Sequence, residues 1–340
     1  MTVPAPGGGG PAAASSLSFA TNGSITASRS LTGETVLVTG ASGFIGRHLV
    51  QRLATLGVGR IVCTSRASKR EAEPPIEWVT ADLGERGAFD ALLGSHRFTR
   101  VIHLATHASG AQSVAAFRAA VDSCVTATGD LLVAALEHCP DARIVMPGSL
   151  EASDPLCGPA EFGSPYAAAK ATAHILAGAA RRLHRLPVVT ARIGFVYGPD
   201  DPNGKRLVPY TIDTLLDGGR ARLSQGLRIE DWIYVDDAAD GLIVAAFAEP
   251  PPDSTDTPDS ADTLDIGSGH PTCARDIVQK LRALIGAGEL AFGELPDRPG
   301  PPGFIADVET TTRLTGWQPR VPLDEGLRKT VDWHRRRRNG

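Results

Sequence analysis

The sequence predicts an α/β fold, a doubly wound parallel sheet followed by a smaller C-terminal lobe, and three observations predict it. From Glu34 onward, short continuous apolar runs alternate with longer segments of helical periodicity, which is the pattern of βαβ units. A glycine-rich turn follows the first apolar run directly. The chain has 340 residues, of which 42% are hydrophobic, so it is long enough for a large core and a second, smaller lobe.

Each apolar run has the length of a strand, and most of the periodic segments have the length of a helix. The predicted strands are 35–39, 61–63, 78–79, 101–104, 143–146, 187–190 and 231–235. The predicted helices are 44–56, 114–137, 166–184, 207–216, 236–248, 274–285 and 323–335. Strands that are apolar throughout are buried on both faces and are joined by right-handed helical crossovers, so we expect the sheet to be parallel.

Residues 39–46 (TGASGFIG) lie between the first strand and the first helix. A glycine turn in this position lets backbone amides approach a pyrophosphate at the positive N-terminus of the helix. Gly40 would permit the tight turn, Gly43 the close approach, and Gly46 the packing of helix on strand. The spacing is GxxGxxG rather than GxGxxG, and its place between strand and helix predicts a nucleotide site. The expected cofactor contacts in the turn are Gly40, Ser42, Gly43, Phe44, Ile45 and Gly46.

The end of the second strand indicates which dinucleotide binds. Ser65 and Arg66 stand there, Lys69 and Arg70 follow, and no carboxylate appears before Glu71. An acidic residue would accept the ribose 2′-hydroxyl, whereas arginine can pair with a 2′-phosphate. NADP(H) is therefore favoured, and NAD(H) stays open because a solvated basic loop would look the same.

Further cofactor contacts are expected where other strands end. Asp82, just after the third strand, could accept hydrogen bonds from the adenine amino group or simply cap the next turn. The remaining expected cofactor contacts are Ser65, Arg66, Leu83, Leu104, Ala105, Thr106, Tyr166, Lys170 and Ile193.

Three side chains predict the chemistry of a hydride-transfer enzyme. Ser149 follows the fifth strand, and Tyr166 and Lys170 are four residues apart in a helical pattern, so they share one face. Reduction of a ketone leaves an alkoxide that needs a proton, and a phenol can supply it if its pKa falls from about 10 toward neutrality. The Lys170 ammonium is placed to favour phenolate, and Ser149 could hydrogen-bond the carbonyl oxygen. Catalytic roles are therefore expected for all three.

These expectations divide the chain into segments. The predicted boundaries are a disordered leader at 1–31, a Rossmann dinucleotide-binding domain at 32–194 with 231–248 returning to it, a substrate-binding lobe at 195–230 and 263–334, and a flexible loop at 250–262. The leader is rich in Gly, Ala, Ser and Pro and lacks the basic start and apolar run of a signal peptide.

Charge, cysteine and histidine patterns argue against several classes of protein. Acidic residues number 38 and basic residues 34, giving a net charge of -4 without a basic stripe, so no nucleic-acid partner is expected. The terminal run 335–338 (RRRR) is expected to be the solvated end of a helix. The five cysteines form no CxxC and the nine histidines no HExxH, so neither a metal site nor a disulfide scaffold is expected. No run of about 18 apolar residues is present, so we expect no membrane partner and a cytoplasmic location.

Together with 192–199 (RIGFVYGP), 231–237 (DWIYVDD) and 315–319 (TGWQP), these motifs resemble the extended short-chain dehydrogenase/reductases, in their epimerase/dehydratase-like branch. The resemblance covers about residues 32–334. It implies a nicotinamide cofactor, Tyr166 as acid/base, Lys170 on the nicotinamide ribose, and usually a nucleoside-diphosphate sugar as substrate.

The resemblance also bears on the reaction. Dehydratases of this branch carry Thr-Asp-Glu where this chain has Ser149-Leu150-Glu151, so Leu150 argues against a 4,6-dehydratase, and a structural role is favoured for Glu151. The stretch 206–232 resembles ketoreductases that act on nucleotide-linked deoxysugars. The expected function is therefore NADP(H)-dependent reduction of the 4-keto group of a nucleoside-diphosphate, here dTDP, 4-keto-6-deoxyhexose. An NAD-dependent epimerase, a reductase of a ketone without a diphosphate, and a non-catalytic nucleotide sensor are the alternatives.

Several positions depart from the family pattern. Phe195 and Glu230 stand where the family usually has Asn and Arg on the diphosphate, and Cys124 stands where an Asn commonly supports a proton relay. The basic residues that could substitute on the diphosphate are Lys205, Arg206, Arg222 and Arg228. The substrate contacts expected overall are His107, Glu151, Arg206 and Arg228. By analogy with relatives, helices 114–137 and 166–184 are expected to pair in a homodimer.

Overall fold

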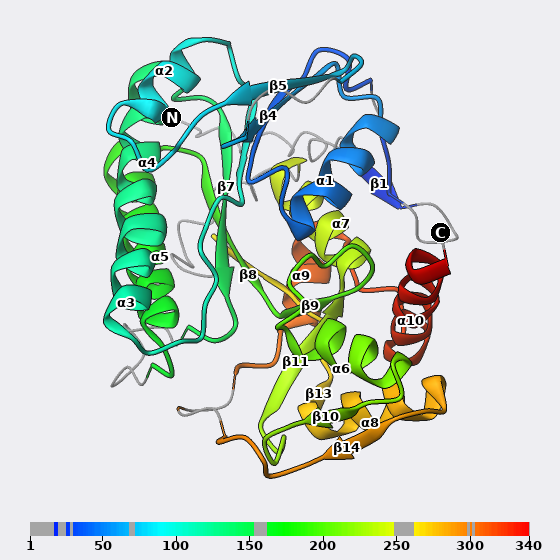
Figure 1. Ribbon diagram of the computed structural model, residues 1–340. Coiled ribbons are helices and arrows are strands. Elements are labelled where there is room, and N and C mark those ends of the chain that lie inside the picture. Colours follow the sequence, from blue (N-terminus) through cyan, green and yellow to red (C-terminus); the bar gives the residue numbers. More distant parts are fainter. Residues whose placement is uncertain are drawn as a thin grey trace, which may run out of the picture.

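The computed structural model describes residues 17–19, 25–27, 30–67, 72–152, 162–247, 262–297, 300 and 303–339. Its main body is a seven-stranded sheet with the strand order β12-β8-β7-β6-β3-β4-β5 (Figure 1). These strands are β3 (Thr35–Thr39), β4 (Arg60–Ser65), β5 (Ile76–Thr80), β6 (Arg100–His103), β7 (Arg143–Ser149), β8 (Val188–Ile193) and β12 (Thr263–Ile266). All neighbouring pairs run parallel, which confirms the predicted doubly wound, Rossmann-like sheet.

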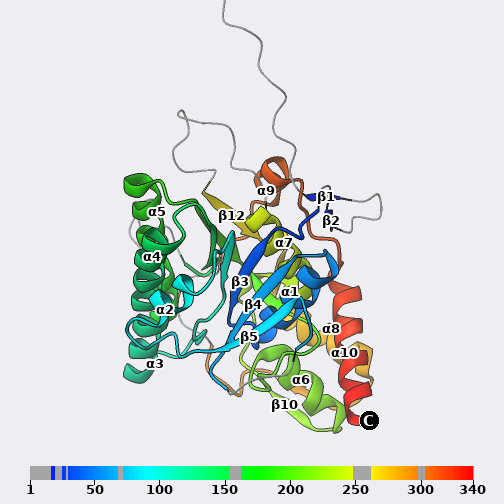
Figure 2. The same ribbon diagram turned by 90° about the horizontal axis from the view of Figure 1, so that it is seen from above.

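Helices cover both faces of this sheet (Figure 2) because successive strand residues point to opposite faces. Val36 and Val38 of β3 belong to one apolar cluster, and Leu37 between them belongs to the other. The first cluster includes residues of α1 (Phe44–Thr55) and α7 (Val235–Phe247). The second includes residues of α2 (Ala88–Gly94), α4 (Ala127–His138) and α5 (Pro165–His184). Strands that are apolar at every position are therefore buried on both faces.

The smaller lobe lies beside the carboxyl ends of the strands (Figure 1). Its strands are β9 (Phe195–Tyr197), β11 (Ile229–Tyr234) and β13 (Pro271–Cys273) in one sheet, and β10 (Arg220–Arg222) and β14 (Glu289–Ala291) in another. Its helices are α6 (Leu207–Leu216), α8 (Ala274–Ile285) and α10 (Leu323–Asn339), and α9 (Val308–Thr315) lies nearby. Tyr197, Ile212, Trp232, Leu281 and Leu327 are buried in its core.

Two segments pair differently from the predicted domain boundaries. We expected residues 231–248 to return to the dinucleotide-binding domain, but β11 pairs with β9 and β13, and only α7 packs on the main sheet. We expected residue 263 onward to belong to the lobe, but β12 is an edge strand of the main sheet, parallel to β8. A short apolar run does not specify which strand it pairs with.

Part of the predicted disordered leader has structure. Strands β1 (Leu17–Phe19) and β2 (Ile25–Ala27) pair antiparallel. Leu17 and Leu31 are buried in the same apolar cluster as residues of α1. These two leucines therefore attach the segment to the core, and the prediction of disorder missed them because it rested on the average composition of the segment. The rest of the leader, positions 68–71 and most of the predicted loop 250–262 lie outside the described residues.

One helical stretch is long and apolar enough, by length and composition, to cross a membrane: Val114–His138. It consists of α3 (Val114–Ala120), a π-helical turn (Val121–Thr126) and α4. Our expectation of no such stretch missed it because isolated charged residues interrupt the apolar run. In this structure it packs against α5, and a core helix of an α/β protein passes the same test.

Candidate functional site

The glycine turn after β3 is shaped for a phosphate group. Gly40 has φ of +65°, and a Cβ there would lie 2.7 Å from the Ala105 nitrogen. A Cβ on Gly46 would collide with the Gly40 carbonyl oxygen. Helix α1 begins after Gly43 with no side-chain cap and no acidic residue in its first turn, so its first N–H groups can receive an anion. This cradle fits the pyrophosphate of a dinucleotide.

The end of β4 carries the residues expected at the adenosine ribose. Arg66 is exposed, and in the part of the chain that the structure describes no ion pair involves it. The Ser65 hydroxyl accepts a hydrogen bond from the Ala67 nitrogen at 3.2 Å. The Asp82 carboxylate accepts one from the Gly84 nitrogen at 3.0 Å. Asp82 therefore caps the turn that follows β5, which is one of the two roles predicted for it. Leu83 beside it is buried.

A buried histidine fixes the end of β6 beside the glycine turn. The Thr39 hydroxyl lies 2.8 Å from His103 Nδ1 and accepts a hydrogen bond from the Ala105 nitrogen at 3.2 Å. Burial lowers the pKa of His103 to about 3, so this imidazole is neutral at physiological pH. The pair holds residues 104–106 against Gly40, where the sequence predicted that they pass under the cofactor.

Tyr166 and Lys170 lie in the first two turns of α5. Ser164 caps this helix by accepting a hydrogen bond from the Ala167 nitrogen at 3.2 Å, and Pro165 opens it, a sequence pattern that favours a helix start at this point. The Lys170 Nζ lies 5.6 Å from the centroid of the Tyr166 ring and donates a hydrogen bond to the Pro147 carbonyl at 2.8 Å. That bond ties α5 to the end of β7.

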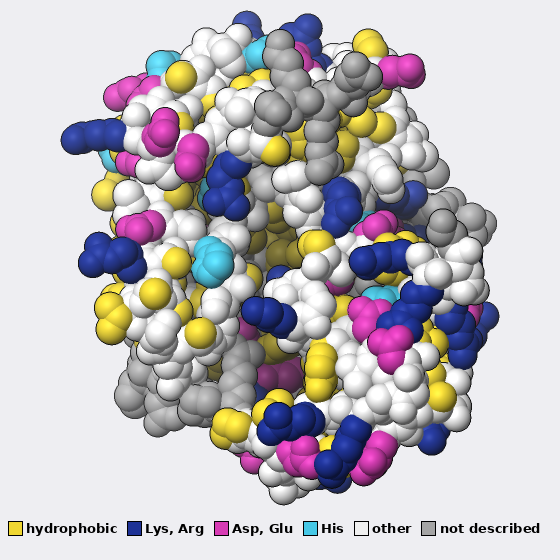
Figure 3. Space-filling view, viewed as in Figure 1, with side chains coloured by type: hydrophobic (Ala, Val, Ile, Leu, Met, Phe, Trp, Pro, Cys, Tyr) yellow, Lys and Arg dark blue, Asp and Glu magenta, His cyan; other side chains and the backbone are white. Residues whose placement is uncertain are grey.

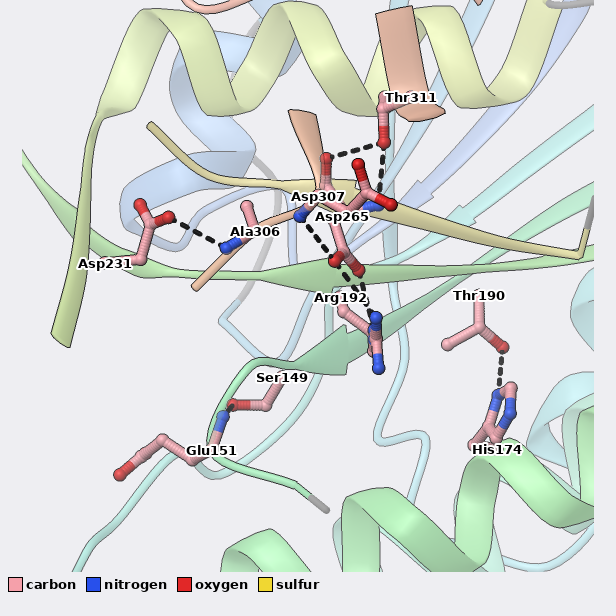
Figure 4. Close-up of polar contacts among 10 residues, drawn as sticks. All are labelled: Ser149, Glu151, His174, Thr190, Arg192, Asp231, Asp265, Ala306, Asp307 and Thr311. Atoms are coloured by element: carbon pink, nitrogen blue, oxygen red, sulfur yellow. Dashed lines mark hydrogen bonds and ion pairs between the residues drawn. The ribbon is translucent and has the colours of Figure 1, made fainter. Parts of the chain in front are cut away.

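Ser149 is the last residue of β7, two positions beyond Pro147. It is buried and pairs in register with Ile193 of β8, another predicted cofactor contact. Its hydroxyl accepts a hydrogen bond from the Glu151 nitrogen at 3.1 Å (Figure 4). The structure therefore brings the ends of β7 and β8 and the start of α5 to one edge of the sheet, as the sequence predicted.

Burial controls the protonation of Tyr166 and Lys170. It raises the pKa of Tyr166 and lowers the pKa of Lys170, so it favours the neutral form of each. Smaller influences on the Tyr166 pKa come from both directions: Cys124 and Glu151 raise it, and Arg206 and a hydrogen bond with Thr106 lower it. The expected fall of the phenol pKa toward neutrality is therefore wrong for this structure, because burial outweighs any effect of Lys170 on Tyr166. The phenol is held protonated, which is the form that a proton donor needs.

The π-helical turn beside Tyr166 was not predicted. Cys124 lies in this turn, is buried, and clusters with Ala169 and Tyr166. Ser123 donates a hydrogen bond to the Ala119 carbonyl at 2.6 Å and accepts one from the His107 nitrogen at 3.2 Å, so the turn positions the exposed loop that holds His107. A π-helical turn has i→i+5 hydrogen bonds and is rare, and the apolar pattern of 114–137 predicted one regular helix there.

The substrate side of the site contains an ion-paired arginine that we expected to contact substrate. Arg228 Nη2 lies 3.5 Å from Glu151 Oε1, and Arg228 Nε contacts Glu230 Oε1. This placement opposes a role for Arg228 as a diphosphate ligand and favours the structural role of Glu151. Leu150 is buried, and its carbonyl accepts a hydrogen bond from the Phe304 nitrogen at 2.8 Å.

The other basic candidates lie in different places. Arg206 precedes α6, where its Nη1 lies 3.3 Å from Asp201 Oδ2 and its guanidinium lies 6.0 Å from the Phe44 ring centroid. Arg222 is exposed on β10 and pairs with Glu294 at 3.2 Å. Figure 3 shows the molecule hollowed between the helical layer of α3 to α5 and the smaller lobe, with acidic side chains deep in the hollow.

Comparisons with known proteins agree with this geometry. Residues 36–254 match the family described as the NAD dependent epimerase/dehydratase family. A dTDP-glucose 4,6-dehydratase of Streptomyces antibioticus is 27% identical over 88% of this chain and 92% of its own. A UDP-glucose 4-epimerase of Mycolicibacterium smegmatis is 28% identical over 88% of this chain and 98% of its own. Among solved structures, MoeE5 in complex with UDP-glucuronic acid and NAD is 25% identical, with a TM-score of 0.75 over 89% of this chain and 99% of that one.

Proposed function

The chain belongs to the NAD dependent epimerase/dehydratase family, and from this premise we propose that it is an NADP(H)-dependent ketoreductase. Its proposed substrate is the 4-keto group of a nucleoside-diphosphate, most simply dTDP, 4-keto-6-deoxyhexose in deoxysugar biosynthesis. The placement of Leu150 carries the proposal, because an apolar, buried side chain follows Ser149 where elimination of water would need an acid. Transfer of a proton to the carbonyl oxygen, as the carbonyl carbon accepts a hydride, is then the chemistry left to Tyr166.

NADP(H) is proposed over NAD(H) because of Arg66. Its exposed guanidinium stands at the end of β4 without an ion pair in the described residues, and arginine can pair with a 2′-phosphate. The glycine cradle at Gly40 and Gly46 and the uncapped start of α1 would hold the pyrophosphate. The bound nicotinamide supplies or removes a hydride at the substrate carbon.

The chain's own residues handle the proton. Ser149 at the end of β7 would donate a hydrogen bond to the carbonyl oxygen and fix its position. Tyr166, kept protonated by burial, would give its phenolic proton to the oxygen as charge develops there. Burial disfavours the ammonium form of Lys170 in the resting site, but the negative charge of a phenolate beside it would favour that form. Lys170, anchored on the Pro147 carbonyl, would then stabilise the phenolate that results.

A turnover assay tests this function. The purified chain is mixed with NADPH and dTDP-4-keto-6-deoxyglucose, and reduced-nicotinamide absorbance is followed. Stoichiometric loss that depends on the sugar is the expected result. Absence of loss together with NAD that stays bound through purification would instead favour an epimerase, the activity named for two of the similar proteins.

We also propose that the chain forms a homodimer through α3, α4 and α5. Large apolar side chains are exposed along these helices, at fractions from 43% to 83%: Val114, Phe117, Val133, Ile175 and Leu183. Exposed apolar patches of this kind mark protein interfaces. Light scattering should give the mass of a dimer for the full chain and the mass of a monomer for Phe117→Glu; a wild-type monomer would contradict the proposal.

A further inference from the structure

Two consecutive side chains of α1 hold the loop that follows β9. Arg47 Nη2 donates a hydrogen bond to the Asp200 carbonyl at 2.9 Å, and Arg47 Nη1 lies 3.9 Å from Asp200 Oδ1. His48 Nε2 lies 3.2 Å from the Pro199 carbonyl oxygen, and His48 Nδ1 lies 2.6 Å from Asp236 Oδ1 in the first turn of α7. We call Arg47, His48 and Asp236 the latch. It ties the helix that follows the glycine turn to the entry of the smaller lobe.

The loop held by the latch, residues 198–206 between β9 and α6, is internally bonded. Asp200 has φ of +65°, a conformation that residues other than glycine rarely adopt and that persists where surrounding contacts hold it. The buried Asp201 carboxylate accepts hydrogen bonds from the Asn203 nitrogen at 3.0 Å and from Arg206 Nη1 at 3.3 Å. The Arg206 nitrogen donates to the Asn203 carbonyl at 2.9 Å. The place of Arg206 therefore depends on the place of Asp200.

Arg206 brings the loop back to the start of α1. Its guanidinium lies 6.0 Å from the ring centroid of Phe44, the first residue of α1, and the Phe44 and His48 rings meet edge to face with centroids 6.0 Å apart. The Arg206 side chain is 41% exposed, so a ligand can reach it. Its positive charge and the uncapped N–H groups of α1 both favour an anion at this end of the helix. The pyrophosphate of the dinucleotide would be that anion.

The two contacts of His48 need a proton on both ring nitrogens. An ionised carboxylate and a carbonyl oxygen only accept hydrogen bonds, a neutral imidazole donates from one nitrogen, and an imidazolium donates from both. Only 12% of the His48 side chain is exposed, so water does not readily replace a lost contact. Loss of one proton would leave either Pro199 or Asp236 without its donor.

Other charged groups lie on α1, on the loop and on the elements beside them. They are Arg47, Arg52, Asp200, Asp236, Asp237, Asp240 and Arg320. Carboxylates and guanidinium groups ordinarily keep their charge between about pH 6 and about pH 9, whereas histidine is the side chain that ordinarily changes charge near this range. Burial raises the pKa of Asp237, and the variants below separate that carboxyl from His48.

We infer that His48 is a positioning residue, which as an imidazolium holds residues 198–206 on α1 and so keeps Arg206 beside the cofactor phosphates. The inference needs a dinucleotide in the glycine turn but no particular sugar and no particular reaction. Hydrogen bonds that involve a charged group are the stronger ones, so the loop is held firmly while His48 is charged and loosely once it is neutral.

Hydrogen exchange of the full chain without cofactor tests the latch. Protection factors, which correct for the intrinsic pH dependence of exchange, should fall at least about threefold at the amides of 203, 205 and 206 between about pH 6 and about pH 9. His48→Gln has no charge to lose and should give low protection at both pH values. Arg47→Gln should lower protection at both and keep the fall. His270→Gln is the matched control, because His270 is exposed in the smaller lobe, and it should behave as wild type.

Calorimetric titration with NAD⁺ tests the consequence for the cofactor. NAD⁺ lacks the 2′-phosphate and keeps its charge over this range, so the protein alone sets the pH dependence. Wild type should bind NAD⁺ at least about threefold more tightly at about pH 6 than at about pH 9. Because the latch acts through Arg206, this difference should be lost in His48→Gln and in Arg206→Gln, and the double variant should show no further loss.

Loop protection that does not change with pH in the wild type would overturn the inference, and this measurement needs no variant. The same fall in His48→Gln as in wild type would also overturn it, because another group would then titrate. NAD⁺ affinity that is independent of pH, or that changes equally in Arg206→Gln, would overturn the role of Arg206. Thermal unfolding at each pH identifies a variant that fails to fold. Absence of NADPH consumption would contradict the proposed function and leave these outcomes as they are.

Discussion

In the parallel sheet, β3 is held by Val36, Leu37 and Val38, whose side chains are apolar and fully buried. In the smaller lobe, buried carboxylates hold the loops that complete the site. Asp231 accepts hydrogen bonds from the nitrogens of Ser268, Gly269 and Ala306 at 2.6, 2.9 and 3.0 Å.

A second carboxylate, Asp265, lies on the edge strand β12 of the main sheet, pairs with Arg192 of β8, and accepts a hydrogen bond from the Asp307 nitrogen at 2.9 Å (Figure 4). Apolar packing is non-directional and tolerates change in shape, whereas each carboxylate fixes particular backbone groups. The interior of the sheet is therefore held by apolar packing, whereas Asp231 and Asp265 fix the backbone of residues 268–269 and 306–307.

The largest effect is expected where the two regions meet, at Tyr166. Tyr166→Phe removes the proton donor, so turnover should fall about 100- to 10,000-fold. Fluorescence titration should show cofactor affinity within about twofold of wild type, because the glycine cradle is untouched. Full activity in this variant would contradict the catalytic role of Tyr166.

The next test compares the contribution of carboxylate hydrogen bonds at Asp231 with that of apolar packing at Leu37. Asp231→Ala leaves three backbone N–H groups without their acceptor and should cost about 3–5 kcal/mol of unfolding free energy, with faster hydrogen exchange at 268–269 and 306 and little change in β3. Leu37→Ala should cost about 2–5 kcal/mol and raise exchange within the sheet itself. Asp276→Ala, an exposed carboxylate of α8, is the control. Equal exchange changes in both regions would show that they unfold as one unit.

A smaller effect, on cofactor affinity, is expected at Arg66, which follows the carboxyl end of β4. Arg66→Gln should weaken NADPH binding about tenfold by removing a charged hydrogen-bond partner, and leave NADH binding unchanged. Arg60→Gln, an exposed arginine at the other end of β4, serves as the comparison. Equal losses of affinity for NADPH and NADH would indicate that Arg66 does not bind the 2′-phosphate.

The last prediction concerns the pH dependence of the free energy of unfolding, through His103 at the end of β6. The pKa of His103 is lowered to about 3 in the folded chain, below its ordinary value of about 6.5. The unfolded chain therefore binds more protons between these values, so the stability that neutral His103 contributes is present above about pH 6.5 and is lost as pH falls toward 3. Urea unfolding at pH 7 and pH 5 should show a weaker pH dependence in His103→Gln than in wild type. The exposed residue His270 provides the control, and an unchanged dependence in His103→Gln would contradict this assignment.

Much of the parallel sheet could be predicted from the sequence. Strands β3 to β8 of the parallel sheet were expected because apolar runs and helical periodicity report burial directly, whereas its edge strand β12 was not. Family membership was expected from the glycine turn and the Tyr166–Lys170 spacing. The domain boundaries around β11 and β12 were not, because strand pairing depends on which segments meet in space.

The substrate end was less predictable for the same reason. Arg228 was expected as a substrate contact because arginines bind phosphate, and sequence separation concealed that Glu151 pairs with it together with Glu230. The π-helical turn that places Cys124 beside Tyr166 was likewise not predicted, because an apolar pattern of helical spacing does not show where an extra residue widens a turn.

By itself, the sequence determined which segments are buried, where a dinucleotide phosphate can approach, and which phenol and ammonium form a pair, because these properties follow from local residue type and spacing. Only the tertiary structure decided which charged side chains pair with one another. Ion pairing joins residues far apart in the chain, and a carboxylate or guanidinium changes its effect on a ligand entirely according to the partner that folding brings to it.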